Sequence, residues 1–483
     1  MTVDYIAYHA LTRPDAVAII HDDRRITYAD FHRDVRRFMR AAQEFDLSPG
    51  AFVAVGCEDF YAHWLLLLAF ERLGIATASL APHDEAPSTA PLLSTMDLVL
   101  SDTEIPARQA ASRYQPITSE WLGRAARLPP LDVEPSLRRK PDDVIRILRT
   151  SGTTGVSKRM LLRRRMHEAR LANWSCFGIT RQDRYFVSMP FTMHATYSMA
   201  TAYIRAGAIA VQDGRGEVGD ALIAHDIDHV ILMPKQLRHV LDHLPGGNAR
   251  PRHLMISSLG APLPTALRAR ALSQLAAEVL DLYACNEAAL VSLKQGESGT
   301  SGALWPGVQV ETLDEGGNLL PPGQAGMIRI ATEAMVEGYV DDPETTARMF
   351  RDGWFYPGDI GVLDGGRRLQ VLGRADELLN IGGEKYAPEH LEEWIMTETG
   401  IDAVGLCTIA DANGVEQLCI AVSGAVAKDK RALERIAQVT GAARSGNVTV
   451  VGVDKIPRTP NGKIQRALLK SAVLEALRRA GAI

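Results

Sequence analysis

The chain has 483 residues, enough for two or more domains with a large core. Its composition, 46% hydrophobic and 23% charged, is that of an ordinary globular protein, and a net charge of −5 gives no basic field for nucleic acid. The start lacks the pattern of a signal peptide, and the longest strongly apolar run, residues 64–70, is too short to span a bilayer. Five scattered cysteines without a C-x-x-C pair predict reduced, buried thiols and a cytoplasmic location.

The first 140 residues alternate helical and strand patterns. Apolar side chains at helical spacing predict a helix over 28–45, followed by a strand over 52–57, a helix over 59–73 and a strand over 74–80. This βαβ rhythm predicts an α/β fold with a mostly parallel sheet. The proline-rich stretch 129–141 is predicted to be a loop.

The stretch 149–162 reads RTSGTTGVSKRMLL and follows a predicted buried strand, VIRIL, at 144–148. Its glycines allow close approach of a ligand, its backbone N–H and hydroxyl groups can donate to an anion, and Lys158 adds a mobile positive charge. The expected ligand is a polyphosphate. The spacing excludes a Walker A motif, and the alternative is a flexible surface loop.

This string resembles the phosphate loop of the acyl-adenylate-forming enzymes, a superfamily of acyl- and aryl-CoA ligases, peptide-synthetase adenylation domains and luciferases. Ser157 and Arg159 replace the usual proline and glycine. The resemblance implies that ATP phosphates are bound by Thr150, Ser151, Gly152, Thr153, Thr154, Gly155 and Lys158.

Two further stretches resemble the nucleotide motifs of this family. A predicted strand at 253–259 is followed by GAPLP and a helix over 265–275, a loose match that implies an adenine pocket of Ser258, Gly260, Ala261 and Pro262. VLDLYACNE, at 279–287, resembles Y-G-x-[TS]-E, which implies that Tyr283 and Asn286 contact the nucleotide, although asparagine replaces the usual hydroxyl residue. Glu287 is then the expected Mg²⁺ ligand, because this hard cation prefers carboxylate oxygen. The alternative for Glu287 alone is a solvated loop carboxylate.

The last third carries three closer matches. GWFYPGDIG, at 353–361, implies that Asp359 accepts from the ribose hydroxyls. GRADELLNIGGEKYAPEHLEEWI, from 373, implies that Arg374 reaches ribose or phosphate, that Asp376 is a hinge, and that Gly383 lies on the loop that admits a thiol. IPRTPNGKIQR, at 456–466, implies that Lys463 is the catalytic lysine, although a lone lysine after glycine is usually solvated.

The stretch 187–207 is predicted to be a strand, a turn and a helix. In the resembling family it forms a wall of the acyl pocket, so His194 is a candidate catalytic-site residue that gates this pocket. The alternative is a histidine that makes a local hydrogen bond at the helix start. Residues 189–205 contain no acidic side chain to pair with an ammonium group, which favours an aryl or fatty acid over a free α-amino acid.

The whole pattern predicts an α/β protein with a large N-terminal domain of mixed sheets flanked by helices, residues 1–373, and a small mobile α+β lid, residues 374–483. Strands over 404–409 and 417–422 and a last helix through 471–480 are expected in the lid. The resemblance implies that a small-molecule carboxylic acid is adenylated with ATP and Mg²⁺, that pyrophosphate leaves, and that the acyl group passes to coenzyme A. The alternatives are transfer to a separate carrier protein or another nucleophile, and a non-catalytic nucleotide-binding relative. No nucleic-acid partner and no membrane span are expected.

Overall fold

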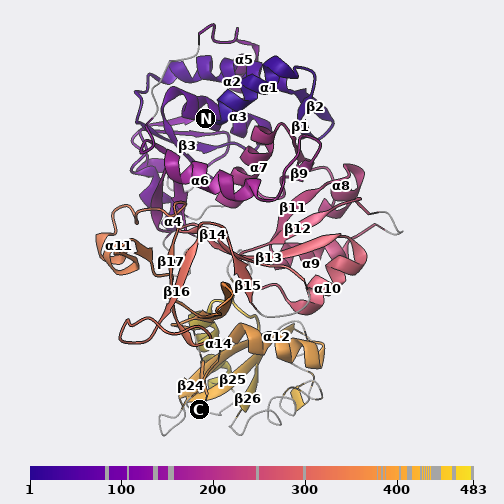
Figure 1. The fold of residues 1–483 in the computed structure, drawn as a ribbon, viewed down its shortest axis with the longest axis vertical. Helices are drawn as coiled ribbons and strands as arrows, with labels where there is room; N and C mark the ends of the chain where they lie inside the picture. Colours follow the sequence, from indigo (N-terminus) through magenta and orange to yellow (C-terminus); the bar gives the residue numbers. More distant parts are fainter. Residues whose placement is uncertain are drawn as a thin grey trace.

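The computed structural model describes residues 1–81, 86–105, 108–133, 140–150, 157–245, 250–296, 301–377, 379–381, 384–386, 388–401, 404–410, 416–424, 427, 429, 431, 433–434, 436, 448–458 and 464–479. Its architecture is α/β, with large mixed sheets flanked by helices, as the sequence predicts (Figure 1).

The largest sheet has 15 strands and runs through most of the first 374 residues. It is parallel from β1 through β10, β9, β11 and β12 to β13, and antiparallel in its remaining pairs. In spatial order its strands are β18 (Phe350–Arg351), β19 (Trp354–Phe355), β17 (Ala325–Ala331), β20 (Asp359–Leu363), β21 (Arg368–Arg374), β15 (Gly302–Leu304), β14 (Ala289–Lys294), β13 (Glu278–Cys285), β12 (Met255–Ser258), β11 (His229–Leu232), β9 (Arg184–Phe186), β10 (Ile209–Gln212), β1 (Val17–His21) and β2 (Arg24–Thr27), with β16 (Gln309–Leu313) paired to β17.

Three smaller sheets complete the β structure. The six-stranded sheet is parallel except for its last pair, β7–β8. In spatial order these sheets contain β6 (Tyr114–Pro116), β5 (Leu98–Ser101), β3 (Phe52–Gly56), β4 (Ala76–Ser79), β7 (Val144–Arg149) and β8 (Arg159–Arg163); β22 (Leu379–Ile381) and β23 (Glu384–Tyr386); and β24 (Val404–Ala410), β25 (Glu416–Val422) and β26 (Val448–Gly452).

The helices cover the sheets. They are α1 (Thr2–Thr12), α2 (Tyr28–Ala42), α3 (Phe60–Leu73), α4 (Ala86–Leu93), α5 (Ser119–Arg127), α6 (Arg164–Ser175), α7 (His194–Ala206), α8 (Val218–Ala224), α9 (Pro234–Asp242), α10 (Thr265–Gln274), α11 (Pro343–Met349), α12 (Pro388–Thr399) and α14 (Arg466–Arg479), with short 3₁₀ turns at Gln43–Phe45 and Arg108–Ala110.

The predicted N-terminal elements are confirmed, and local chemistry explains their ends. Helix α3 begins after Asp59, whose side chain accepts from the N–H of Ala62, and ends at Gly74, which has a left-handed φ of 94°. Its apolar run, Trp64–Phe70, is buried, so these side chains form part of the hydrophobic core. No helix in the described ranges is long and apolar enough to cross a membrane.

Three expectations differ from the structure. The sequence predicted that the strand before α7 begins at residue 187. In the structure this strand is Arg184–Phe186, so it ends just before that residue, and Val187 adds only one backbone hydrogen bond, to Val211. The last helix starts at Arg466, earlier than predicted, because Leu469 and Val473 already belong to its buried face. The five cysteines are free, but Cys176 is exposed and so is not a buried thiol.

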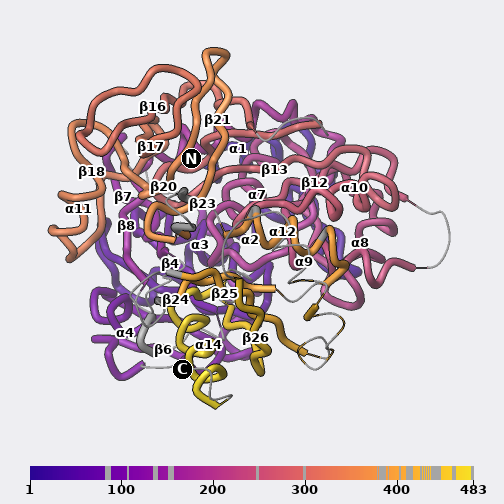
Figure 2. Tube along the Cα trace, turned by 90° about the horizontal axis from the view of Figure 1, so that it is seen from below, coloured from indigo at the N-terminus to yellow at the C-terminus, as the bar shows by residue number. Residues whose placement is uncertain are grey.

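The C-terminal part has its own hydrophobic cores. Two apolar clusters, around β24–β25 and around α14, contain only residues from Leu379 onward, whereas the other clusters contain none beyond Val371. Figure 1 shows these elements together at one end of the long axis of the molecule, and Figure 2, seen from below, shows β24, β25, β26 and α14 side by side. The predicted boundary at 373 is compatible with this separation and stays a prediction.

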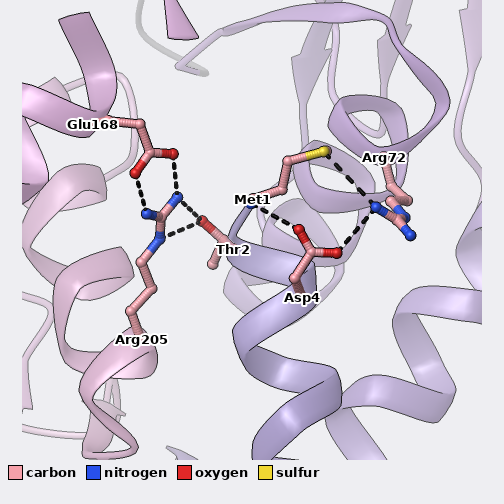
Figure 3. A network of polar contacts seen from close by, with 6 residues as sticks. All are labelled: Met1, Thr2, Asp4, Arg72, Glu168 and Arg205. Atoms are coloured by element: carbon pink, nitrogen blue, oxygen red, sulfur yellow. Dashed lines mark hydrogen bonds and ion pairs between the residues drawn. The ribbon is translucent and has the colours of Figure 1, made fainter. Parts of the chain in front are cut away.

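Polar contacts at the N-terminus join α1 to α3 and α7, and join α7 to α6 (Figure 3). The amino group of Met1 pairs with Asp4, which also pairs with Arg72 of α3. Arg205 of α7 donates to Thr2 Oγ1 at 3.2 Å and forms an ion pair with Glu168 of α6 at 2.5 Å. This network therefore fixes α6 against α7.

Candidate functional site

The neck of the predicted phosphate loop is closed by hydrogen bonds. The strands β7 and β8 pair antiparallel on either side, the N–H of Thr150 donates to the Lys158 carbonyl at 2.9 Å, and the N–H of Lys158 donates to Thr150 Oγ1 at 3.0 Å. Arg159, where the family has glycine, bonds Thr95 Oγ1 at 2.7 Å and pairs with Asp341. The remaining predicted phosphate ligands, Ser151, Gly152, Thr153, Thr154 and Gly155, lie outside the described residues.

Asn286 ties the turn after β13 to this neck. Its Nδ2 donates to the carbonyl of Arg149 at 2.7 Å, and its own carbonyl accepts from Arg170 at 2.8 Å. The residue that departs from the family pattern therefore bonds the protein backbone at the start of the loop.

Tyr339 connects two predicted site residues from distant parts of the chain. Its hydroxyl donates to Glu287 Oε1 at 2.9 Å, and the ammonium of Lys158 lies 4.9 Å from its ring centroid. Burial raises the pKa of Tyr339 well above its usual value, and the Glu287 carboxylate raises it further, so the phenol stays protonated and donates. Sequence reasoning missed Tyr339, because a single tyrosine on a loop carries no charge pattern or periodicity.

Lys158 also forms an ion pair with Asp342, at 3.2 Å, across side chains that are about one-third exposed. Asp342 caps α11 by accepting from the N–H of Thr345. Sequence reasoning missed this partner as well. The signal for it was present, because an aspartate followed by proline at 343 is typical of a helix start.

Glu287 is half-buried, and its backbone carbonyl is fixed by the N–H of Val336 at 2.8 Å. No group of three or more histidine, cysteine or acidic side chains that could hold a metal occurs in the part of the chain that the structure describes. A single positioned carboxylate fits Mg²⁺, which keeps water and substrate-phosphate ligands and does not require a protein cage.

Asp359, Arg374 and Tyr283 form a second polar group, held by strand pairing. Asp359 begins β20 directly opposite Arg374 at the end of β21, and their side chains approach to 3.6 Å. The hydroxyl of Tyr283, on β13, donates to Asp359. Arg374 also bonds Asp376 at 3.1 Å and the carbonyl of Pro357. Three predicted residues are therefore in contact, and the candidate hinge Asp376 is bonded to one of them.

The candidate adenine loop follows the carboxyl end of β12. Ser258 pairs with Leu232, the last residue of β11, and with Asp281 of β13, so two neighbouring parallel strands end at one edge of the sheet, where α/β sheets commonly bind ligands. Ser258 is fully buried, and its Oγ has no hydrogen-bond partner among the described residues. Gly260 has a φ of +91°, which favours glycine. Ala261 is half-buried and Pro262 is exposed.

His194 is the first residue of α7 and is buried. Neither ring nitrogen has a partner in the described ranges, so the alternative of a local hydrogen bond at the helix start is wrong. Burial lowers its pKa well below the usual value, and the guanidinium of Arg170 lowers it further. The ring is neutral and centred 5.8 Å from that of His167.

Two predicted residues of the C-terminal part, Lys463 and Gly383, lie outside the described residues. Their roles stay predictions, as do the contacts of every candidate residue with a nucleotide.

The chain resembles known proteins over nearly its full length. A ligase for 3-[(3aS,4S,7aS)-7a-methyl-1,5-dioxo-octahydro-1H-inden-4-yl]propanoyl-CoA from Rhodococcus jostii is 27% identical over 94% of this chain and 95% of its own. The fatty acid–[acyl-carrier-protein] ligase ScoC of Streptomyces coeruleorubidus is 24% identical over 97% and 95%. The crystal structure of ATP-bound MatB from Rhodopseudomonas palustris is 22% identical and superposes with a TM-score of 0.84 over 98% of this chain and 99% of that one, which shows the shared fold.

A family model described as "AMP-binding enzyme" matches residues 6–340. This range contains the neck of the phosphate loop, the edge at Ser258, and the turn with Glu287. The chain belongs to the AMP-binding enzyme family.

Proposed function

We propose that this protein is an ATP-dependent acid–thiol ligase that adenylates an aryl or fatty carboxylic acid and then transfers the acyl group to coenzyme A. The observation that carries the proposal is the position of Tyr339, which contacts both the Glu287 carboxylate and the Lys158 ammonium. The carboxylate suits a metal counter-ion and the ammonium suits phosphate oxygens, so the two groups together suit a polyphosphate with its bound cation. The choice of coenzyme A as the acyl acceptor is supported by the relative from Rhodococcus jostii, which is a CoA ligase.

The nucleotide would be held by two groups. Asp359, fixed by Tyr283 and Arg374, offers carboxylate oxygen to the ribose hydroxyls. Lys158 and the donors of the 150–158 loop would hold the β- and γ-phosphates. Glu287 would bind Mg²⁺, which supplies positive charge to phosphate oxygens.

The first half-reaction is attack of the substrate carboxylate on the α-phosphorus, with pyrophosphate as the leaving group. Charge on the in-line transition state is the main barrier, so positioning and cations matter most. Lys463 would bridge the carboxylate and the α-phosphate. No side-chain nucleophile is required.

The second half-reaction replaces AMP on the acyl carbonyl by the thiol sulfur of coenzyme A. We propose that a lid of residues 374–483 rotates about Asp376, which withdraws Lys463 and brings the loop of Gly383 to the thiol channel. One contact across the proposed boundary supports a defined docking of the lid, because Glu393 of α12 accepts from the N–H of Thr265 at 2.7 Å.

The acceptor has two alternatives. ScoC, an acyl-carrier-protein ligase, supports a separate carrier protein as the second candidate. A non-thiol nucleophile is the other. A non-catalytic role is disfavoured, because the Glu287 and Asp359 carboxylates keep defined positions. A cytoplasmic location stays a prediction.

The test is pyrophosphate release with benzoates, cinnamates, fatty acids and the common amino acids, with and without coenzyme A. We expect release with an aryl or fatty acid and a thioester only when coenzyme A is present. Release without a thioester would favour another acceptor, whereas the absence of acid-dependent ATP–pyrophosphate exchange would contradict the enzyme.

A further inference from the structure

Two buried histidines from adjacent helices lack hydrogen-bond partners among the described residues. His167 of α6 is 1% exposed and His194 of α7 is 4% exposed. None of their four ring nitrogens has a hydrogen-bond partner in the part of the chain that the structure describes. Buried polar atoms are nearly always paired in native proteins, so this cluster indicates a group that is bound there.

Each ring can offer both a donor and an acceptor. Burial lowers the pKa of both histidines well below the usual value, and nearby guanidinium groups lower it further, so the imidazoles are neutral. A neutral imidazole has one N–H donor and one bare nitrogen acceptor. The pair therefore matches a group that donates and accepts at the same atom.

The two rings are close neighbours, with centroids 5.8 Å apart. One oxygen atom that makes two hydrogen bonds of about 2.9 Å can bridge ring nitrogens that are at most about 5.8 Å apart. Nitrogens on the ring edges that face each other are closer together than the centroids, so one oxygen beside the two rings can reach a nitrogen of each. The ion pair of Glu168 with Arg205 joins the same two helices, so it helps hold this spacing (Figure 3).

The two neighbouring guanidinium groups are only partly engaged, because Nε of Arg146 has no hydrogen-bond partner among the described residues. Arg170 donates to the carbonyls of Ala334 and Asn286. Arg146 donates to Ser79 Oγ at 2.9 Å and lies over the ring of Tyr197, at 4.0 Å. These guanidinium groups keep their positive charge, whereas the unpartnered imidazoles are neutral and can pair with a neutral hydroxyl. A carboxylate drawn to the guanidinium groups is therefore the alternative that the test includes.

The cluster is connected to the candidate site. Arg170, whose charge lowers the pKa of both histidines, donates to the carbonyl of Asn286, the residue that bonds the neck of the phosphate loop. The buried cluster is thus linked to the turn that carries Glu287, and an acid held near that turn would direct its tail toward α6 and α7.

We infer that His167 and His194 together bind a hydroxyl group on the tail of the acid, so that the substrate is a hydroxylated aryl or fatty carboxylate. This inference rests on the proposed function, because it places the acyl group beside α7. The hydroxyl hydrogen bonds the bare nitrogen of one ring, and its oxygen accepts from the N–H of the other.

The test compares acids that differ by one hydroxyl: benzoate with its monohydroxy forms, cinnamate with its monohydroxy forms, and octanoate with its ω-hydroxy form. Terephthalate and suberate test a second carboxylate. For the best pair we expect kcat/KM for pyrophosphate release to be at least about tenfold higher with the hydroxylated acid, because the parent acid leaves the rings unpaired. Equal rates within every pair, or preference for a dicarboxylic acid, would overturn the inference.

Variants identify the residues responsible. In His167→Leu and in His194→Leu we expect the ratio between the two acids to fall toward one, because kcat/KM falls much more for the hydroxylated acid than for its parent. A structural role would lower both acids equally. His225→Gln is the matched control, since that imidazole already pairs with Asp213 at 3.0 Å, and its ratio should equal that of wild type. A ratio that persists in both leucine variants contradicts the inference.

A binding measurement separates this inference from the proposed function. In the full-length wild-type protein with ¹⁵N-labelled histidine, the hydroxylated acid should shift the ring-nitrogen resonances of two histidines, and its parent should not. These resonances are assigned by their loss in the leucine variants. No histidine shift contradicts the inference even if pyrophosphate is released, whereas two shifted histidines without pyrophosphate release from any acid contradict the proposed function alone.

Discussion

Asn286 offers the sharpest test of how the candidate site is assembled. Its side-chain amide donates to the carbonyl of Arg149 at 2.7 Å and so joins the turn before Glu287 to the neck of the phosphate loop. Replacement by alanine removes this bond and leaves both strands, β7 and β13, in place. The expected result is a loop whose neck is less well positioned for ATP.

The magnitude follows from the type of bond. A neutral amide–carbonyl hydrogen bond contributes about 1 kcal/mol net, which corresponds to about a fivefold change in an equilibrium constant. We therefore expect Asn286→Ala to lower kcat/KM for ATP about fivefold. Asn286→Asp has the same size but directs a carboxylate at the Arg149 carbonyl, so its loss should exceed that of alanine.

The assay is ATP–pyrophosphate exchange at saturating acid, with ATP varied. The KM for the acid and the melting temperature serve as controls, and both should change little, because the bond lies at the half-buried loop neck. An unchanged kcat/KM for ATP in Asn286→Ala, or an aspartate variant as active as wild type, would refute the argument that this bond positions the loop.

Three further predictions concern other charged groups. Burial raises the pKa of Asp281 to about 6, above an unfolded value of about 4, so the folded state retains a proton and stability falls as the pH rises from about 4 to about 6. Asp281→Asn should therefore raise the free energy of unfolding by about 2 kcal/mol at pH 7.5. Equal urea midpoints of the variant and the wild type at that pH would contradict this. Asp342→Asn keeps a good helix cap but releases Lys158, so the KM for ATP should fall about two- to fivefold in pyrophosphate exchange, and an unchanged KM argues against Lys158 as a phosphate ligand. Lys463→Ala should abolish adenylate formation and spare thioester formation from supplied acyl-AMP, so equal loss in single-turnover assays of the two half-reactions would rule out its assigned role.

Local sequence was sufficient to predict most of the elements, and its motifs named the candidate residues, whose roles stay predictions. The apolar and polar periodicities at 28–45, 52–57 and 59–73 predicted elements that the structure contains, because one buried face of a single helix or strand determines such a pattern. Strand pairing then brings Asp359 opposite Arg374, two residues that motifs had already identified. The predicted bounds of the strand before α7 were wrong, because the ends of a strand depend on its pairing partners, and here only Arg184–Phe186 pair with the neighbouring strands.

Only the tertiary structure decided which side chains meet. Tyr339 contacts Glu287 and Lys158 because the loop after β17 packs against the turn after β13, and nothing in the neighbouring sequence of any of the three encodes that packing. His167 and His194 are paired because α6 lies against α7, so their burial and unpartnered nitrogens come from a contact between two helices. Sequence by itself determined the chemistry available along the chain, because residue type and local spacing are local properties. Contact between distant residues depends on the packing of whole elements, and only the folded chain specifies it.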